Sequence, residues 1–350
     1  MSTGTKLLRL TFETLHRSGV AAALRPWSQG LGVIFCMHSV QPEKPSADGF
    51  TPNAGLTSTP EFLDAALTML RQAGYDLISL DDALLRIEEG RSAKPFAVFT
   101  LDDGYRDNLV HALPVFEKHS CPFVVYVTPG FVEASTEMWW LALERIIDKE
   151  TGRLEAGNVS AVLDGSAASK WAAWSVLSPV VQGMPEHEQR TWIRETSARF
   201  GFDLAALCQE LIMSWNEVRK LAAHPLATIG AHTLNHFAVS RLPEEEARRE
   251  ITVSGKALER ELGRPVRHFA YPYGNVAHAG VRDFRLAAEA GYATAVTTRM
   301  GTVYPQHVRH LQALPRVMVS SKYAEPRWLK VLASGLPGRM NNLGRKLNVR

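Results

Sequence analysis

The chain has 350 residues, of which 45% are apolar and 21% charged, and its formal net charge is +3. This composition is typical of a soluble globular protein with one large or two small domains, and it excludes a largely disordered chain. A charge of +3 is too small to indicate nucleic-acid binding, and no apolar run is long enough to span a bilayer.

Three cysteines, Cys36, Cys121 and Cys208, are widely spaced and odd in number. Such spacing indicates neither a disulfide framework nor a zinc knuckle, and free thiols suit a reducing compartment. The N-terminal segment does not look like a secretory signal, because Thr11 and Glu13 interrupt its apolar run. We therefore expect a cytoplasmic protein.

Residues 1–30 are expected to form a helical extension of the domain. Apolar side chains recur there at roughly helical spacing, at Leu7, Leu8, Phe12, Leu15 and Val20. That spacing favours a helix packed on the domain. A helix on a membrane surface is the weaker alternative, since the segment is short and only mildly basic. A peripheral membrane contact therefore stays open.

Between the two ends, strand-like and helix-like segments alternate, as in proteins whose parallel strands are joined by helical crossovers. Strands are expected over residues 32–37, 75–80, 96–101, 122–127, 227–231, 268–271 and 293–297, with a last extended segment over 311–319. Helices are expected over residues 61–72, 80–89, 109–119, 243–262, 281–290 and 326–333. Thr59 and Pro60 provide an N-cap and a first-turn proline for the first of these helices. About seven strand–helix units result, in one domain over residues 31–335.

The segment from about 133 to 223 breaks this alternation and is expected to be a helical insertion in that domain. It contains six of the eight tryptophans, namely Trp139, Trp140, Trp171, Trp174, Trp192 and Trp215. Because tryptophan is far more often a large core residue than a ligand platform, most of them are expected to anchor the insertion helices. The alternative is that one or two line a binding groove by stacking.

Residues 336–350 are basic, with Arg339, Arg345, Lys346 and Arg350, and they also contain glycine, asparagine and proline. We expect this basic C-terminal tail to be frayed and solvated. A weak contact with acidic lipid or an anionic glycan is the alternative.

Two adjacent carboxylates, Asp102 and Asp103, follow the apolar run from Phe96 to Leu101. Burying two charges at the end of a strand is costly unless something compensates them. Adjacent side chains on a strand point to opposite faces, and Gly104 gives the following turn its freedom, so the two residues can play different roles. Taken alone, Asp-Asp-Gly is more often a turn that caps a helix.

His232 and His236 follow the expected strand over residues 227–231. A lone histidine is more often packed than a ligand, but a pair at this spacing, with an acid pair elsewhere, favours a metal site. Two imidazoles and one carboxylate leave coordination positions for water and substrate, as a catalytic zinc site requires. Cobalt, nickel and iron accept the same ligands. The residues therefore predict a hydrolase that uses a divalent metal.

These motifs resemble those of the polysaccharide deacetylases, a carbohydrate esterase group with the NodB homology domain. The family motif T-F-D-D-G resembles Thr100 to Gly104, the motif H-[S/T]-x-x-H resembles His232 to His236, and the third motif resembles Phe269 to Gly274. The resemblance runs from about Leu31 to Ser320. It implies an α/β fold, a distorted (β/α)7 barrel, and hydrolysis of N-acetyl groups on an N-acetylated sugar or oligosaccharide.

The resemblance also implies roles for individual residues. Asp103, His232 and His236 would bind the metal, for which zinc is the first expectation, and Asp102 would be the general base. The backbone N–H of Tyr273 would stabilise the oxyanion. Three further residues, Tyr271, Pro272 and Tyr105, are expected beside the substrate.

Two departures from the commonest family pattern concern the acid and the base. The late L-x-L-H motif, which often supplies an acid histidine, has no clear match. His38, between Val33 and Val40, instead resembles the early histidine of a rearranged branch that includes the biofilm poly-N-acetylglucosamine deacetylases, and by that resemblance it is the acid. Ala270 stands where an arginine often tethers the base, and we hypothesise that Arg316 replaces it.

Two other functions stay open on the sequence alone. The first is an amidohydrolase of the same fold that acts on a small non-sugar amide, and a closed, compact pocket would favour it. The second is a non-catalytic glycan-binding protein. The missing arginine is consistent with this second alternative, whereas the intact aspartate and histidine motifs argue against it. The sequence predicts neither the glycan, nor the native metal, nor the oligomeric state.

Overall fold

The centre of the molecule is a curled, all-parallel sheet, shown by a computed structural model that describes residues 3–43, 46, 48–320 and 325–349. Its strands are β1 (Gly32–Met37), β4 (Asp76–Leu77), β5 (Phe96–Leu101), β6 (Phe123–Val127), β9 (Ala227–Ala231), β10 (His268–Ala270), β11 (Thr294–Val296) and β12 (Val317–Met318). Short apolar runs bounded by glycine, proline or polar residues form these strands, because such runs can be buried on both faces.

The sheet closes on itself into a distorted barrel. The strands run in the order β11-β10-β9-β6-β5-β1-β12, and β4 pairs with the start of β5. A parallel bridge between Val296 and Leu314 connects β11 to the segment that leads into β12, while β12 pairs with β1. The predicted fold, a distorted (β/α)7 barrel, is therefore confirmed. The last extended segment is shorter than predicted, since residues 311–313 form a 3-10 turn before β12.

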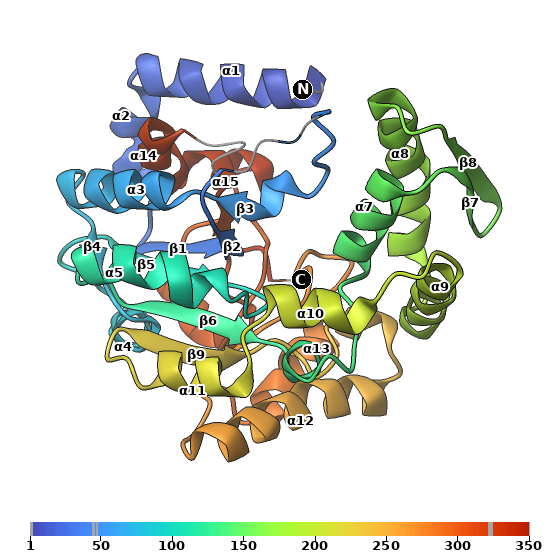
Figure 1. Cartoon of the computed structure of the whole chain (residues 1–350). Coiled ribbons are helices and arrows are strands. Elements are labelled where there is room, and N and C mark those ends of the chain that lie inside the picture. Colours follow the sequence, from blue (N-terminus) through green and yellow to red (C-terminus); the bar gives the residue numbers. More distant parts are fainter. Residues whose placement is uncertain (1–2, 44–45, 47, 321–324, 350) are drawn as a thin grey trace.

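Helices cover the outside of the sheet (Figure 1). They are α3 (Pro60–Gln72), α4 (Leu80–Glu88), α5 (Leu113–Lys118), α11 (Trp215–Ala222), α12 (Glu244–Leu262) and α13 (Val281–Glu289). Thr59 caps α3 as predicted, since its side chain accepts a hydrogen bond from the N–H of Phe62.

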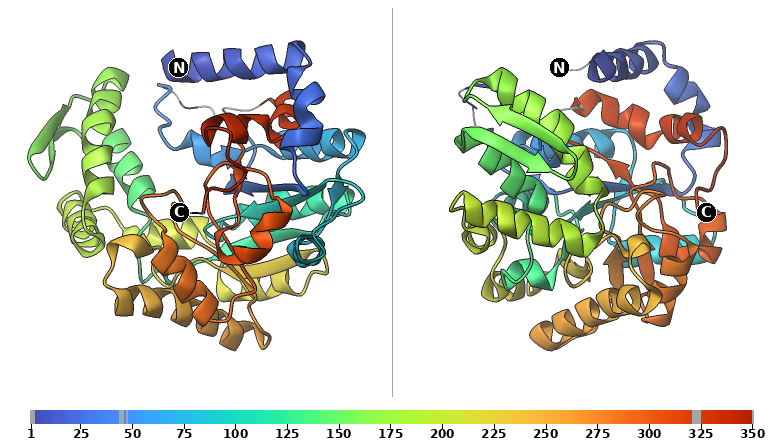
Figure 2. Two further views of the ribbon diagram at one scale, coloured as in Figure 1. Left: turned by 180° about the vertical axis from the view of Figure 1, so that it is seen from behind. Right: turned by 90° about the vertical axis from the view of Figure 1, so that its right-hand side faces the viewer.

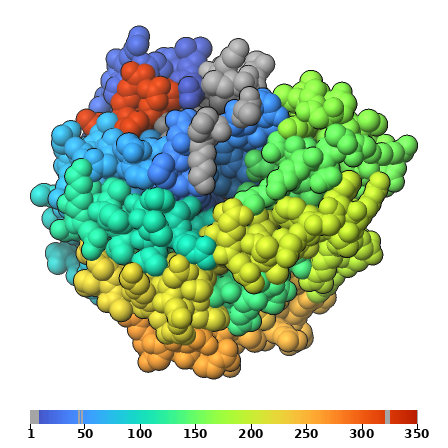
Figure 3. Space-filling model, in the orientation of Figure 1, coloured from blue at the N-terminus to red at the C-terminus, as the bar shows by residue number. Residues whose placement is uncertain are grey.

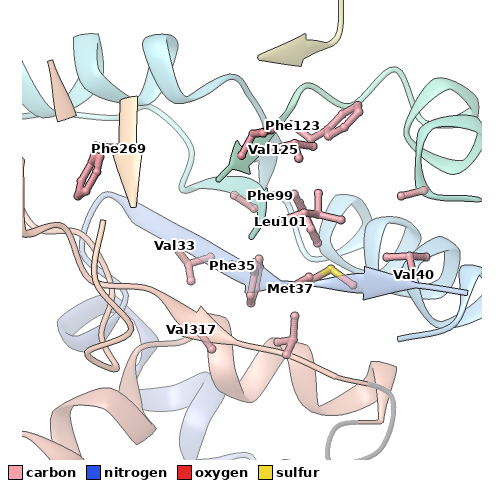
Figure 4. Close-up of a cluster of buried hydrophobic side chains, with 14 of the residues drawn as sticks. Val33, Phe35, Met37, Val40, Phe99, Leu101, Phe123, Val125, Phe269 and Val317 are labelled. Atoms are coloured by element: carbon pink, nitrogen blue, oxygen red, sulfur yellow. The ribbon is translucent and has the colours of Figure 1, made fainter. Parts of the chain in front are cut away.

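Side chains alternate between the two faces of the strands. Those that face the helices form a large apolar cluster, in which Val33 and Phe35 of β1 pack with Phe99 of β5 (Figure 4). On the other face, Ile34 belongs to a second cluster with Val98 and with residues of β6. Because the period is two residues, Thr100 and Asp102 follow Val98 on that second face, so the strand carries Asp102 toward the interior of the barrel.

The insertion lies beside the barrel and has a core of its own (Figures 1 and 2). Its elements are α6 (Pro129–Val132), α7 (Trp139–Lys149), β7 (Gly152–Ala156), β8 (Val159–Leu163), α8 (Ala167–Gly183), α9 (Glu186–Arg199) and α10 (Leu204–Leu211). The antiparallel hairpin β7–β8 differs from the expectation of helices alone. Its residues alternate between buried and exposed, and Gly157, with φ of 58°, begins the turn that the hairpin needs.

The two ends of the chain pack together on one side of the barrel. The N-terminal helices are α1 (Thr3–Arg17) and α2 (Val20–Ser28), and the C-terminal ones are α14 (Leu329–Ala333) and α15 (Leu336–Asn341). The first part of the expected frayed tail, Leu336–Asn341, is helical instead, with Pro337 and Gly338 buried, and the carbonyl of Asn348 accepts a hydrogen bond from Arg299. Residues 343–346 between these contacts are exposed, as expected of a solvated tail. Position 350 lies outside the described residues. Among the helices described, none is both long and apolar enough to cross a bilayer.

Candidate active site

The predicted site residues come from different strands but meet at one rim of the barrel. His38 follows β1, the aspartate pair follows β5, the histidine motif follows β9, and Tyr273 follows β10. Because all these strands are parallel, their carboxyl ends lie at the same end of the barrel, where barrel enzymes place functional residues.

Asp103, His232 and His236 form a buried cluster that fits a divalent metal. Their side-chain donor atoms all lie within 4.8 Å of one another. Oδ1 of Asp103 lies 3.2 Å from Nε2 of His236 and 3.5 Å from Nε2 of His232. That buried oxygen has no hydrogen-bond partner, and such an atom is costly unless a cation or proton satisfies it. The donor set, two imidazoles and one carboxylate, is the set of a catalytic zinc site.

A hydrogen bond fixes the orientation of one of these imidazoles. Nδ1 of His232 lies 2.7 Å from the carbonyl oxygen of Ala270 and donates to it, which turns Nε2 toward Asp103. Burial lowers the pKa of His236 to about 4, so the His236 side chain is neutral near pH 7. Burial alone would raise the pKa of Asp103, but His232 and His236 bring it well below its ordinary value. All three groups are thus ready to bind a cation.

Left-handed backbone conformations gather at this rim. Four non-glycine residues have positive φ angles here: Asp103 (74°), Thr233 (58°), His236 (59°) and Tyr273 (60°). Such conformations cost non-glycine residues free energy and persist at functional sites, where they aim side chains that regular strands would misdirect. Gly104, with φ of 76°, continues the turn after Asp103, and a Cβ at this position would lie 3.4 Å from the Val127 side chain.

Asp102, the other carboxylate, is paired with a buried arginine. Nη1 and Nη2 of Arg316 donate to Oδ1 and Oδ2 of Asp102 at 2.7 and 2.6 Å, and Nη1 also donates to Thr100. Burial alone would raise the pKa of Asp102, but the charge of Arg316 outweighs it, and the pKa lies below its ordinary value. The structure therefore brings Arg316 to the carboxylate, as hypothesised from the sequence. Its fork-shaped contact holds both carboxylate oxygens in one orientation.

His38 lies next to this pair and is half-buried. Side-chain donor atoms of Cys36, His38 and Asp102 all lie within 4.8 Å of one another. The side-chain amide of Asn108, at the start of a π-helical turn (Asn108–Ala112), donates to the carbonyl of His38 at 2.8 Å. Asp107, the residue before Asn108, accepts hydrogen bonds from the two residues that follow His38 in the chain. The sequence analysis missed Asp107 and Asn108, because they act on a backbone segment that lies 70 residues away.

The aromatic residues predicted beside the substrate have different positions. Tyr273 is half-buried, and its ring lies 5.2 Å from that of His236. The Tyr271 side chain is in the core instead, where it packs on Phe269 and donates to the carbonyl of Gln312, so its assignment to substrate binding is wrong. Pro272, which stands between these two tyrosines in the sequence, is also buried. Tyr105 is buried against the core of the insertion.

The insertion contributes side chains that surround the histidine motif. The indole N–H of Trp139 donates to the hydroxyl of Tyr273 at 2.9 Å, and the Trp140 ring lies 5.0 Å from that of His236. Arg190 of α9, which the sequence analysis did not single out, donates to the carbonyls of Glu137 and His236. These contacts fit the expectation that tryptophans anchor the insertion, and they place two of them at the site itself.

The comparison with protein families decides the identity of this fold and site. The family model described as polysaccharide deacetylase matches residues 89–295. This chain belongs to the polysaccharide deacetylase family. Members of the family hydrolyse N-acetyl amide bonds, so the chain is a hydrolase acting on linear amide C–N bonds. His38 and Arg316 both lie outside the matched segment.

Solved structures of other deacetylases share the fold. The Streptococcus pyogenes deacetylase PplD in complex with acetate has a TM-score of 0.57 and 16% identity, covering 86% of this chain and 97% of that chain. IcaB from Ammonifex degensii has a TM-score of 0.53 and 19% identity, covering 88% and 98%. The BpsB deacetylase domain from Bordetella bronchiseptica has a TM-score of 0.50 and 16% identity, covering 84% and 97%. No curated protein sequence matches the chain.

Proposed function

We propose that this deacetylase removes N-acetyl groups from an N-acetylated sugar or oligosaccharide, with a divalent metal ion bound by Asp103, His232 and His236. The observation that carries the proposal is the buried, unpartnered oxygen of Asp103 between two imidazoles, beside a second carboxylate paired with arginine. One of the similar structures, the Streptococcus pyogenes deacetylase PplD, is in complex with acetate, which is the product expected from N-acetyl hydrolysis.

The ligands favour zinc, and cobalt, nickel or iron fit the same set. When bound, such an ion polarises the acetyl carbonyl and lowers the pKa of water from ~15.7 toward ~7. This leaves the proton transfers to side chains of the chain itself.

Asp102 acts as the general base. Arg316 keeps its carboxylate ionised and fixes both oxygens, so that one face of the carboxylate is presented to the attacking water. The pairing also explains why the two adjacent aspartates have different roles. Asp102 is paired with an arginine, and Asp103 lies next to two histidines.

His38 acts as the general acid that protonates the leaving amine. It reaches the site from β1, within 4.8 Å of the Asp102 side chain, and its loop is held by Asn108. An acid on a different strand from the base can deliver its proton from another side of the amide. The backbone N–H of Tyr273 stabilises the oxyanion, and the left-handed turn at Tyr273 is held by the hydrogen bond from Thr298 to its carbonyl.

The test is acetate release from N-acetylglucosamine oligomers by the purified full chain, stripped of metal and then refilled with zinc or cobalt. Release should require metal and should vanish in Asp102→Asn, which keeps the metal ligands but removes the base. Asp103→Asn should lose both release and stoichiometric metal. A protein that binds metal but releases no acetate from any oligomer would contradict the proposed substrate class and favour a small amide. No metal binding at all would contradict the metal site.

A further inference from the structure

The two ends of the chain form one layer with an unusual charge. Residues 1–30 and 326–350 contain ten of the 39 lysines and arginines but only one, Glu13, of the 36 acidic residues. The rest of the chain therefore has 29 basic and 35 acidic residues and is net negative. Figure 3 shows the two ends side by side on one face of the molecule. We call these residues the terminal layer.

Hydrogen bonds connect the two halves of the terminal layer. The Ser28 hydroxyl of α2 donates to the carbonyl of Ser334 at 2.6 Å, and the Trp328 indole donates to Glu13 at 2.9 Å. Glu13 also forms ion pairs with Arg17 and Arg327. Glu13 is thus ion-paired within the layer, and no other Asp or Glu in these two segments offsets their lysines and arginines.

Apolar side chains of this layer are exposed in a regular pattern. Val20, Leu24 and Trp27 are exposed at positions i, i+4 and i+7 of α2, which is one face of the helix, and Trp27 is 71% exposed. The two buried residues of α2, Ala21 and Ser28, lie on a neighbouring face of the helix. Leu343, just after α15, is 86% exposed. An apolar stripe that faces outward is unusual for a helix packed on a domain, because its side chains are not buried and so do not stabilise the fold.

We infer that the terminal layer docks on a phospholipid bilayer with anionic headgroups. The terminal layer carries an outward apolar stripe that ends in tryptophan, and it also carries the exposed basic residues Arg345 and Lys346. Apolar insertion and positive charge are the two forces that hold proteins at a bilayer surface. Tryptophan prefers the boundary between headgroups and acyl chains. No acidic residue occurs between positions 14 and 42 or after Glu325, so anionic lipid meets little repulsion. This inference does not depend on the proposed substrate.

The test is co-sedimentation of the full chain with phosphatidylcholine vesicles that contain or lack phosphatidylglycerol. We expect binding to the anionic vesicles only, weakened by salt. The double variants Leu24→Ser with Trp27→Ala, and Arg345→Glu with Lys346→Glu, should each weaken it roughly tenfold. Acetate release from a soluble oligomer should be unchanged, which shows that each variant is folded.

Two matched controls use sites outside the layer. Val162 of β8 is 69% exposed, so Val162→Ser removes a comparable apolar group from the insertion. Arg260→Glu reverses an exposed charge on α12, on the opposite side of the barrel (Figure 1). Both controls should bind vesicles like the wild type. Absent binding, or equal losses in controls and layer variants, would overturn the inference. A concentration-dependent dimer that Trp27→Ala abolishes, without vesicle binding, would assign the surface to a second copy of the chain.

Discussion

Two adjacent residues, Asp102 and Asp103, show how local geometry separates two carboxylates that the sequence presents as a pair. Asp102 continues the strand alternation and points into the barrel, where Arg316 pairs with both of its oxygens. Asp103 takes a left-handed conformation and turns toward the histidines. Since each carboxylate has its own compensating charge, neither needs the other, and both are ionised in the same buried site.

Replacing Arg316 should change the pKa and the orientation of the general base, Asp102. In Arg316→Ala, Asp102 is left buried and unpaired, so its pKa rises and the acid limb of the pH profile of kcat/KM moves to higher pH. We expect kcat/KM at neutral pH to fall about 100-fold because the base loses its orientation. We also expect a loss of about 3–5 kcal/mol in the free energy of unfolding. Arg316→Lys should retain the charge but not the two-pronged contact, and should recover part of the activity.

A matched control separates this effect from the loss of any buried arginine. Arg299 is also buried near the rim, and its guanidinium donates to the carbonyls of Ala279 and Asn348. Arg299→Lys should leave the acid limb in place. If Arg316→Ala kept the wild-type pH profile, its role in positioning Asp102 would be refuted.

Asp107 should make stability depend on pH in an unusual direction. Burial raises its pKa from 3.8 to about 6, although the carboxylate accepts hydrogen bonds from Ser39 and Val40. Between these two pH values the folded protein binds more protons than the unfolded chain, so the free energy of unfolding falls as the pH rises. Relative to Asp107→Asn, the wild type should lose about 1–3 kcal/mol between pH 4 and pH 7. Urea unfolding of both proteins across this range checks it, and parallel curves would contradict it.

At the scale of elements, the sequence predicts those strands and helices whose bounds depend on the local pattern of apolar and polar residues. The strands Gly32–Met37, Phe96–Leu101 and Ala227–Ala231 have the predicted bounds, because each is an apolar run that ends at polar or glycine residues. The site residues at their ends follow from the rule that parallel strands end at one rim. Their convergence therefore needed no long-range information.

Other elements depend on contacts that no local pattern reveals. Strand β12 has only two residues, and it exists because β1 supplies its partner. The hairpin β7–β8 did carry a signal, alternation on either side of Gly157, which the helical periodicity of its neighbours obscured. Residues 336–341 look like a tail by composition but are helical because Pro337 and Gly338 are buried against the rest of the molecule.

The helix α9 should support the metal site from outside the barrel. Buried Arg190 donates to the backbone carbonyls of Glu137, Asn235 and His236, and so holds the turn that carries one ligand. Arg190→Met leaves these carbonyls unpaired, and we expect metal affinity to fall about 10- to 100-fold. Zinc titration by isothermal calorimetry measures this.

One turn along the same helix, Arg194 offers the control for that experiment. It is 56% exposed and contacts the side chain of Glu137 rather than a site carbonyl. Arg194→Met should change zinc affinity little, because Arg194 contacts no backbone carbonyl of the histidine motif. Equal effects of the two substitutions would show that α9 supports the fold in general and not the metal site.

At the scale of the whole molecule, the site joins segments that lie near the two ends of the chain. Arg316 is 216 positions from Thr100 and 214 positions from Asp102 along the chain, yet it donates hydrogen bonds to both. The sequence-distant strands β1 and β12 meet where His38 and Arg316 enter the site. Both residues fall outside the family match, so the acid and the support of the base come from the strands that close the barrel.

Metal binding should therefore stabilise the whole folded chain and distinguish the two aspartates. The ligands come from two different strands and converge only in the folded state, so zinc binds the folded form and raises the free energy of unfolding. At a free zinc concentration about 100 times the Kd, the gain should be about 2.7 kcal/mol, visible as a higher Tm. Asp103→Asn should abolish this gain, because it removes the carboxylate ligand. Asp102→Asn should keep it, because Asp102 is engaged by Arg316. A zinc-dependent Tm that Asp102→Asn abolishes and Asp103→Asn retains would reverse the two assignments.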